Sequence, residues 1–141
     1  LLLVILVTII VGIATVVAIN TFGSAADSAN LDAARQDLAS IAASAQGYYM
    51  KPTMLGGGGN SYTGLTFRNI TFAAETISGD GLSATNANGT YSIETAADDV
   101  LEVQVDPSNE ANPTLEIASV ADEPTNFTTT EVDEGATEPE E

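Results

Sequence analysis

The sequence predicts an α+β fold, in which one long N-terminal α-helix packs by its second half on a small antiparallel β-sheet head. Two observations predict it. Residues 1–50 contain no proline and keep a helical pattern, apolar at first and then amphipathic. Beyond Pro52, short runs of alternating apolar and polar residues are separated by turn signals. We expect four parts: a helical rod, a crossing loop, a β head and an acidic disordered tail, at 1–50, 51–61, 62–132 and 133–141.

The first 26 residues carry no charge, and residues 1–19 are apolar apart from Thr8, Gly12 and Thr15. As a helix, nineteen residues span about 28 Å, close to the roughly 30 Å hydrocarbon core of a bilayer. A secretory signal peptide is the alternative, since "GSAAD" resembles a cleavage site, but its apolar region is usually shorter, about 7–15 residues. We therefore expect a transmembrane helix that is later buried among copies of itself.

The candidate core of such a polymer consists of the large apolar side chains of this segment: Leu1, Leu2, Leu3, Val4, Ile5, Leu6, Val7, Ile9, Ile10, Val11, Ile13, Val16, Val17, Ile19 and Phe22. The chain begins at Leu1, with neither Met nor a basic leader before the apolar run. We expect either a trimmed sequence or removal of a leader by a peptidase directly in front of this helix.

The second half of the rod has an apolar stripe with spacings of three and four residues, which indicates one face of an amphipathic helix. We expect this stripe to pack on the head: Leu31, Ala34, Leu38, Ile41, Ala45 and Tyr48. Polar residues occupy the other faces. Asp32 and Arg35 are spaced to form an ion pair at i,i+3.

The stretch "YYMKPTMLGGGGNSYTGL" ends the helix, because the residue before a proline avoids the α region. Four consecutive glycines allow backbone conformations that other residues avoid. A flexible linker is one interpretation. Tyr48 and Tyr49 favour an ordered crossing loop, because aromatic side chains at the helix end can pack against it. The predicted hinge residues are Tyr49, Pro52, Gly56, Gly57, Gly58 and Gly59.

The head is predicted to contain half-buried antiparallel strands. Alternation is clearest in "TYSIET", "VLEVQVD" and "TLEIASV", while "SYTGLTFRNITF" has strand composition and "TNFTTTEVD" suits an edge strand. The segment "SGDGLSATNANG" is expected to be loop, with a tight turn at Asn88-Gly89. The buried face would be formed by Tyr91, Ile93, Leu101, Val103, Val105, Leu115 and Ile117.

An apolar N-terminal helix, an amphipathic extension and a small β head together resemble the type IV pilin superfamily. The segment "GYYMKPTMLGGGGNSYTG", after an Ala-rich helix with "INTFG" near its membrane end, is similar to bacterial pilin-like subunits with a glycine-rich loop. The resemblance covers residues 1 to about 72, and the head in architecture only. It implies polymerisation through the helix, with a prepilin peptidase and pilus assembly machinery as partners.

One feature departs from that family. Its members usually begin with a methylatable aromatic residue and carry a glutamate five residues in, which is thought to pair with a neighbour's N-terminal amine. Here the positions hold Leu1 and Ile5, and the first acid is Asp27. The charge-pairing mechanism of subunit addition therefore does not transfer to this chain as it stands.

Charge excludes several classes of function. The chain has 20 acidic and 3 basic residues, and no His, Cys or Trp. Nucleic-acid binding needs Lys or Arg to neutralise phosphates, so it is not expected. The missing His and Cys remove most transition-metal sites and nucleophile–base pairs, so we expect neither an enzyme nor a cofactor. Asp98, Asp99, Asp106 and Glu110 suit a solvated acidic face better than a calcium site, because they lack EF-hand spacing.

The acid excess suits either an ordinary extracellular surface or a protein that works in concentrated salt, where charge repulsion is screened. Asn69, Asn88 and Asn126 each begin a possible glycosylation sequon. The favoured function is the major structural subunit of an extracellular type IV pilus-like filament, a homopolymer that serves adhesion, surface attachment or motility. Before assembly the chain would lie in the cytoplasmic membrane. The alternatives are a single-pass membrane-anchored binding protein and a minor pilin or pseudopilin of a secretion system.

Overall fold

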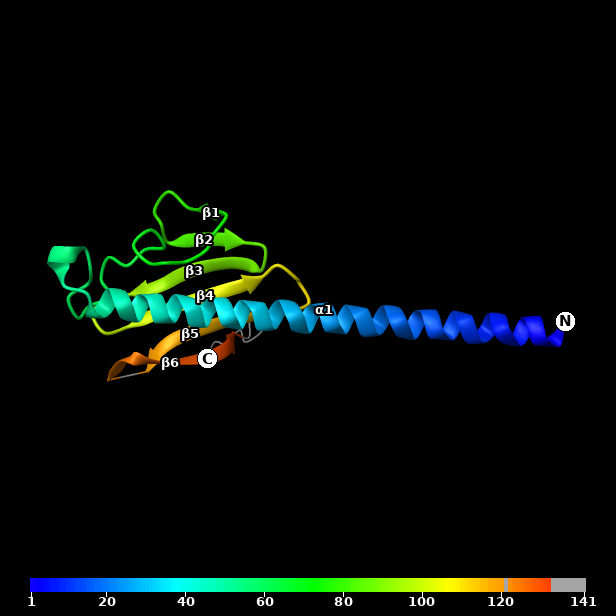
Figure 1. Cartoon of the computed structure of the whole chain (residues 1–141). Coiled ribbons are helices and arrows are strands. Elements are labelled where there is room, and N and C mark those ends of the chain that lie inside the picture. The colour runs from blue at the N-terminus through cyan, green and yellow to red at the C-terminus, as the bar shows by residue number, and fades with distance from the viewer. Residues whose placement is uncertain (121, 133–141) are drawn as a thin grey trace, which may run out of the picture.

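The computed structural model describes residues 1–120 and 122–132, and it confirms the α+β fold (Figure 1). Helix α1 runs without interruption over Leu2–Met50, which makes it about 74 Å long. Its first half projects alone from the rest of the molecule, while its second half lies across a sheet (Figure 1). The helix ends at Lys51, whose backbone is extended (φ −74°, ψ 130°) as the following proline requires.

A six-stranded antiparallel sheet forms the head, with the strands in sequence order from one edge to the other. Every strand therefore pairs with its neighbour in the sequence, and each connection is local. The strands are β1 (Thr76–Ile77), β2 (Ser83–Asn86), β3 (Gly89–Ala96), β4 (Leu101–Pro107), β5 (Thr114–Val120) and β6 (Glu123–Val132). A short 3-10 helix, η1 (Thr53–Leu55), follows α1.

One face of the sheet and one face of α1 form the core. Side chains on β4 alternate strictly, with Leu101, Val103 and Val105 buried and the residues between them more exposed. The helix lies mainly over β4 and β5. Because the helix covers this face, the other face of the sheet carries Thr, Ser, Gln and Glu, as the alternating pattern predicts.

The prediction of a strand at 61–72 is wrong. This segment has no strand, and Tyr62, Leu65 and Phe67 are buried in a series of turns between the helix end and the sheet. Two of its backbone bonds close turns: the Leu65 N–H donates to the Tyr62 carbonyl, and the Asn69 N–H donates to that of Thr66. Two others are isolated long-range bonds, from the Tyr62 and Phe67 N–H groups to the Asp98 and Gly81 carbonyls, and they do not form a ladder. Thr and aromatic side chains favour strands only where a neighbouring strand is available.

Two smaller expectations also need correction. The stretch 78–89 is not all loop, because β2 lies inside it and pairs with both β1 and β3. The tight turn falls on Ala87 and Asn88 rather than on Asn88-Gly89, since Gly89 already pairs with Asn86. The edge strand is present as β6. The predicted acidic tail, 133–141, lies outside the described residues.

Candidate functional site: the apolar helix and its carrier head

The first half of α1 presents its large apolar side chains to solvent on all sides. Each of the fifteen candidate core residues is at least half exposed, from 50% for Val7 to 99% for Leu1. The most apolar stretch has a mean hydropathy of 3.2 and none of it is buried. By length and composition the helix could cross a membrane. No part of the described head covers it.

The three threonine hydroxyl groups of this half are satisfied within the helix. The hydroxyl groups of Thr8, Thr15 and Thr21 donate to the carbonyls of Val4, Val11 and Val17, at 2.7, 2.8 and 2.9 Å. A hydroxyl paired with the carbonyl four residues earlier leaves no donor that needs water. These three hydroxyl groups can therefore enter an apolar environment without an unpaired donor.

A shallow apolar depression lies on this surface around Gly12. Ile9, Ile13, Val16 and Val17 line it with Gly12, where the missing side chain leaves open space. An apolar side chain of a neighbouring helix would fit such a notch.

The stripe predicted to carry the head faces the sheet. Ala34, Leu38, Ile41 and Ala45 are fully buried, and Tyr48 is 8% exposed. Leu31 is half-buried at the edge of this contact, and Ala42 is a buried position that the spacing did not include. Removal of a buried Leu side chain such as Leu38 typically costs about 2–5 kcal/mol of stability. The second half of α1 is thus an integral part of the head.

Polar contacts beside the stripe fix the helix on the sheet, and sequence reasoning missed them. One carboxylate oxygen of Asp37 accepts hydrogen bonds from Asn86 Nδ2 (3.0 Å), Asn88 Nδ2 (2.8 Å) and Tyr91 Oη (2.6 Å). Partial burial raises the pKa of Asp37, but these hydrogen bonds outweigh it and hold the pKa below its usual value. Burial, reinforced by the bond to Asp37, raises the pKa of Tyr91.

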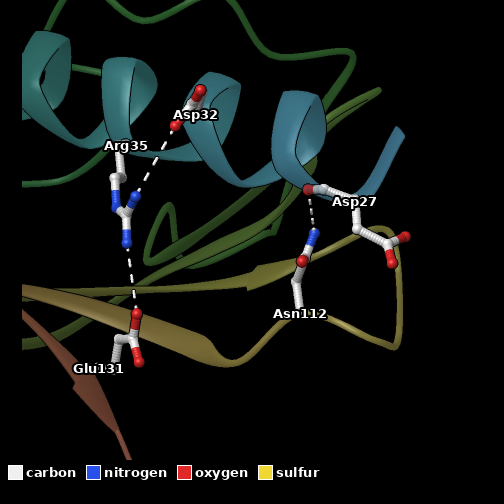
Figure 2. A network of polar contacts seen from close by, with 5 residues as sticks. All are labelled: Asp27, Asp32, Arg35, Asn112 and Glu131. Atoms are coloured by element: carbon white, nitrogen blue, oxygen red, sulfur yellow. Dashed lines mark hydrogen bonds and ion pairs between the residues drawn. The ribbon is translucent and has the colours of Figure 1, made fainter. Parts of the chain in front are cut away.

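The β4–β5 loop is bonded to the start of the second half of α1, which packs on the sheet. Asn112 Nδ2 donates to the Asp27 carbonyl at 2.9 Å, as Figure 2 shows, and to the Asn30 side chain at 3.0 Å. Asn109 donates to both the Asp27 carboxylate and the Asn30 side-chain oxygen. These bonds mark the point where the apolar half ends and the head begins.

Arg35 joins the helix to the edge strand of the sheet. It pairs with Asp32 at 3.7 Å and with Glu131 of β6 at 3.3 Å (Figure 2). The i,i+3 pair was predicted, and the pair with Glu131 was not. Further toward the C-terminus, Gln46 Nε2 donates to the Thr125 carbonyl of β6 at 2.6 Å. The helix is therefore attached to β6 at two levels.

The crossing loop is ordered and folds back onto the end of α1. The N–H groups of Gly58, Gly59 and Asn60 donate to the carbonyls of Tyr48, Lys51 and Tyr49, at 2.8, 2.9 and 2.7 Å. A Cβ on Gly58 would lie 1.8 Å from the Ser61 carbonyl oxygen, and Gly59 has a φ of +61°. Both positions therefore require glycine.

The two tyrosines anchor this loop to the head. Tyr48 Oη donates to the Thr63 carbonyl at 3.1 Å, and Tyr49 Oη donates to Asp99 at 3.0 Å. The Tyr49 ring packs on Tyr62 with 4.8 Å between centroids. Burial raises the pKa of Tyr62 to about 12, and its hydroxyl donates to the Pro124 carbonyl.

The Asp98–Asp99 pair accepts hydrogen bonds from side chains around the crossing loop. The Asp98 carboxylate accepts from Ser61 Oγ and Thr63 Oγ1, at 3.0 and 3.2 Å, on the far side of the crossing loop. Among residues 1–120 and 122–132, no three His, Cys, Asp or Glu side chains are grouped to hold an ion. These two acids therefore help to hold the crossing loop against the head.

The three sequons differ in how their amide groups are engaged. Asn88 Nδ2 donates to Asp37 in a half-buried position. Asn69 Nδ2 donates to the Gly64 carbonyl at 3.1 Å, and its oxygen accepts from Thr66. Asn126 is exposed on edge strand β6 and donates to Glu123 at 2.6 Å. The amides of Asn69 and Asn126 thus bond only within their own segments, whereas that of Asn88 bonds to the helix.

Comparison of the chain with protein-family models, with curated proteins and with solved structures finds no match to any of them. The similarity to pilins therefore stays a prediction that depends on the residues and their arrangement.

Proposed function

We propose that this chain is the major structural subunit of an extracellular type IV pilus-like filament, which polymerises through the first half of α1. One observation carries the proposal: a rigid helix half with fifteen exposed large apolar side chains and no partner in the described part of its own chain. Burial of one such side chain stabilises by about 1.5–3 kcal/mol. Together they give on the order of 20–45 kcal/mol, so water is not their final environment.

Lipid and sister helices are the two apolar environments available, and the charges beside the segment favour sister helices. The side of the helix toward the head has no Lys or Arg before Arg35, and no Trp or Tyr before Tyr48. Membrane anchors commonly carry such residues at the interface. Asp27, an acid, comes first instead. Lipid would hold the helix before assembly, and identical helices would surround it afterwards.

The straight connection between the two halves also suits a polymer. The helix enters the head without a linker, and side-chain bonds from Asp37, Arg35 and Gln46 fix it there. A rigid connection gives every copy the same angle between core helix and head, which a helical array requires. Because lipid is already apolar, transfer from membrane to filament gains little, so extraction would need work from an assembly machine.

Electron microscopy of material sheared from producing cells tests this proposal. We expect helical fibres composed of this chain. Val16→Asp should abolish them, because it places a carboxylate among packed apolar side chains, whereas Thr130→Asp on exposed β6 should leave fibres intact. Wild-type chains found only as membrane-bound monomers would contradict the proposal and favour the second candidate, a membrane-anchored surface protein, which the membrane-spanning length of the helix also allows.

A further inference from the structure

The most exposed apolar side chains of the head lie together where α1 meets the crossing loop. Met50, Met54 and Leu55 are 64%, 95% and 67% exposed. Elsewhere in the described head, the exposed large apolar side chains do not exceed the 42% of Val100. We call residues 50–55 the tip. Three large exposed apolar side chains within six residues form a patch of the kind that marks interaction surfaces.

The tip is held rigidly. The Leu55, Gly56 and Gly57 N–H groups donate to the carbonyls of Pro52, Thr53 and Pro52, at 3.0, 3.0 and 3.1 Å. The glycine bonds to the end of α1 described above hold the same turn from the other side. A preorganised surface loses little conformational freedom on binding. The ordered loop therefore holds its apolar side chains in fixed positions.

A cation without an ion-pair partner lies within the tip. Arg35 pairs with Asp32 and Glu131, and Arg68 donates to the Ser78 carbonyl. Among the described residues, Lys51 has no carboxylate within 4 Å. A surface with apolar side chains and one free ammonium is complementary to an apolar surface with a carboxylate.

An exposed aromatic side chain and an exposed carboxylate both lie near the opposite end of the head. Phe22 is 76% exposed, just before the point where the β4–β5 loop is bonded to Asp27 and Asn30. Glu110, on that loop, is exposed. We call Phe22, Asp27 and residues 108–113 the shoulder. It lies toward the N-terminus of the helix and the tip lies at the other end (Figure 1). The helical rise between Phe22 and Met50 is about 42 Å.

We infer that the tip of one copy docks on the shoulder of the next, with Met54 and Leu55 against Phe22 and Lys51 facing Glu110. The inference depends on the proposed function and names a second contact for the same polymer, at the head-side end of the helix core. Methionine sulfur packs favourably on aromatic rings. A contact between unlike ends of identical molecules repeats without closing when the copies are displaced along an axis, and here the offset is about 40 Å.

Cross-linking tests the contact cleanly because the chain has no cysteine. In assembled filaments, the double variant Lys51→Cys with Glu110→Cys, treated with a short bismaleimide, should give a ladder of covalent oligomers. The matched control, Lys51→Cys with Thr130→Cys, places the second thiol on exposed β6 and should give no ladder. Normal filaments of the first variant without a ladder would overturn the inference and leave the proposed function intact.

A charge exchange decides the case in which the cysteine variant does not assemble. Lys51→Glu should lower the filament yield by about fivefold, and the double exchange Lys51→Glu with Glu110→Lys should restore it. Lack of rescue, in a variant whose head is folded, would also overturn the inference. Failure of the wild-type chain to form filaments at all would instead refute the proposed function.

Discussion

Asp37 of α1 and Tyr91 of β3 are joined by a 2.6 Å hydrogen bond from the phenol to the carboxylate. The same carboxylate oxygen accepts from Asn86 and Asn88, on the β2 side of the hairpin. Tyr91 is fully buried, and its ring packs edge-to-face on Phe72 at 4.9 Å. A single side chain of the helix therefore bonds to both strands and to the turn of the β2–β3 hairpin.

Loss of this carboxylate should loosen the head. Asp37→Asn keeps the shape but removes the charge, and we expect it to lower the free energy of unfolding by about 1–3 kcal/mol, because hydrogen bonds to charged groups are the stronger ones. Asp32→Asn is the matched control, since its ion pair with Arg35 is exposed and typically contributes under about 1 kcal/mol. Denaturant unfolding of detergent-solubilised monomers measures both; equal effects would contradict the role of Asp37.

The same bond predicts an acid dependence. The pKa of Asp37 in the folded chain lies below its usual value of 3.8. The unfolded chain therefore takes up a proton first as pH falls, so the stabilisation is complete above the unfolded value and is lost as pH drops through the folded one. The stability gap between wild type and Asp37→Asn should be full at pH 6 and much smaller at pH 2. An unchanged gap in the same unfolding measurement would refute this.

Two glycines only eleven positions apart should respond in opposite ways to alanine. Gly58→Ala would place a Cβ 1.8 Å from the Ser61 carbonyl oxygen, so the crossing loop must move. We expect a loss of about 2 kcal/mol or more in thermal unfolding, comparable to other strained substitutions. Gly47→Ala has open space in the last turns of α1 and should stabilise by about 0.5–1 kcal/mol. Tolerance of both substitutions would show that the loop is not fixed.

Salt should strengthen the assembled form. The formal net charge is −17 per chain, so neighbouring heads repel one another. The Debye length is about 3 Å at 1 M salt and about 30 Å at 10 mM. Filaments transferred to 10 mM salt should soften or unravel, as seen by electron microscopy and light scattering. Unchanged diameter and length would remove the salt-adapted interpretation without affecting the filament proposal.

The sequence predicted the helix well because its signals are local and repeated. The apolar run, the spacing of Leu38, Ile41 and Ala45, and the proline at position 52 each depend on near neighbours in the chain. The three alternating strands β3, β4 and β5 were visible for the same reason. The strand prediction for 61–72 was wrong, because β-prone side chains such as Tyr62 and Phe67 pack equally well in turns when no strand lies beside them.

The polar attachments of the helix were out of reach of sequence reasoning. Asp37, Asn30 and Gln46 each stand directly beside a stripe residue, which was the only signal present. Their partners lie 49 to 82 residues away, on strands and loops whose positions depend on the completed sheet. A polar residue next to an apolar stripe is equally compatible with a solvated helix edge, so the pattern alone did not separate the two.

The most direct test of the central claim is a density map of the assembled particle from producing cells, at a resolution that shows side chains. We predict that the side chains from Leu1 to Ile19 contact the same segment of several sister copies, with neither lipid nor water among them. A map in which this half of α1 is surrounded by lipid or detergent, and touches no other copy, would contradict the claim.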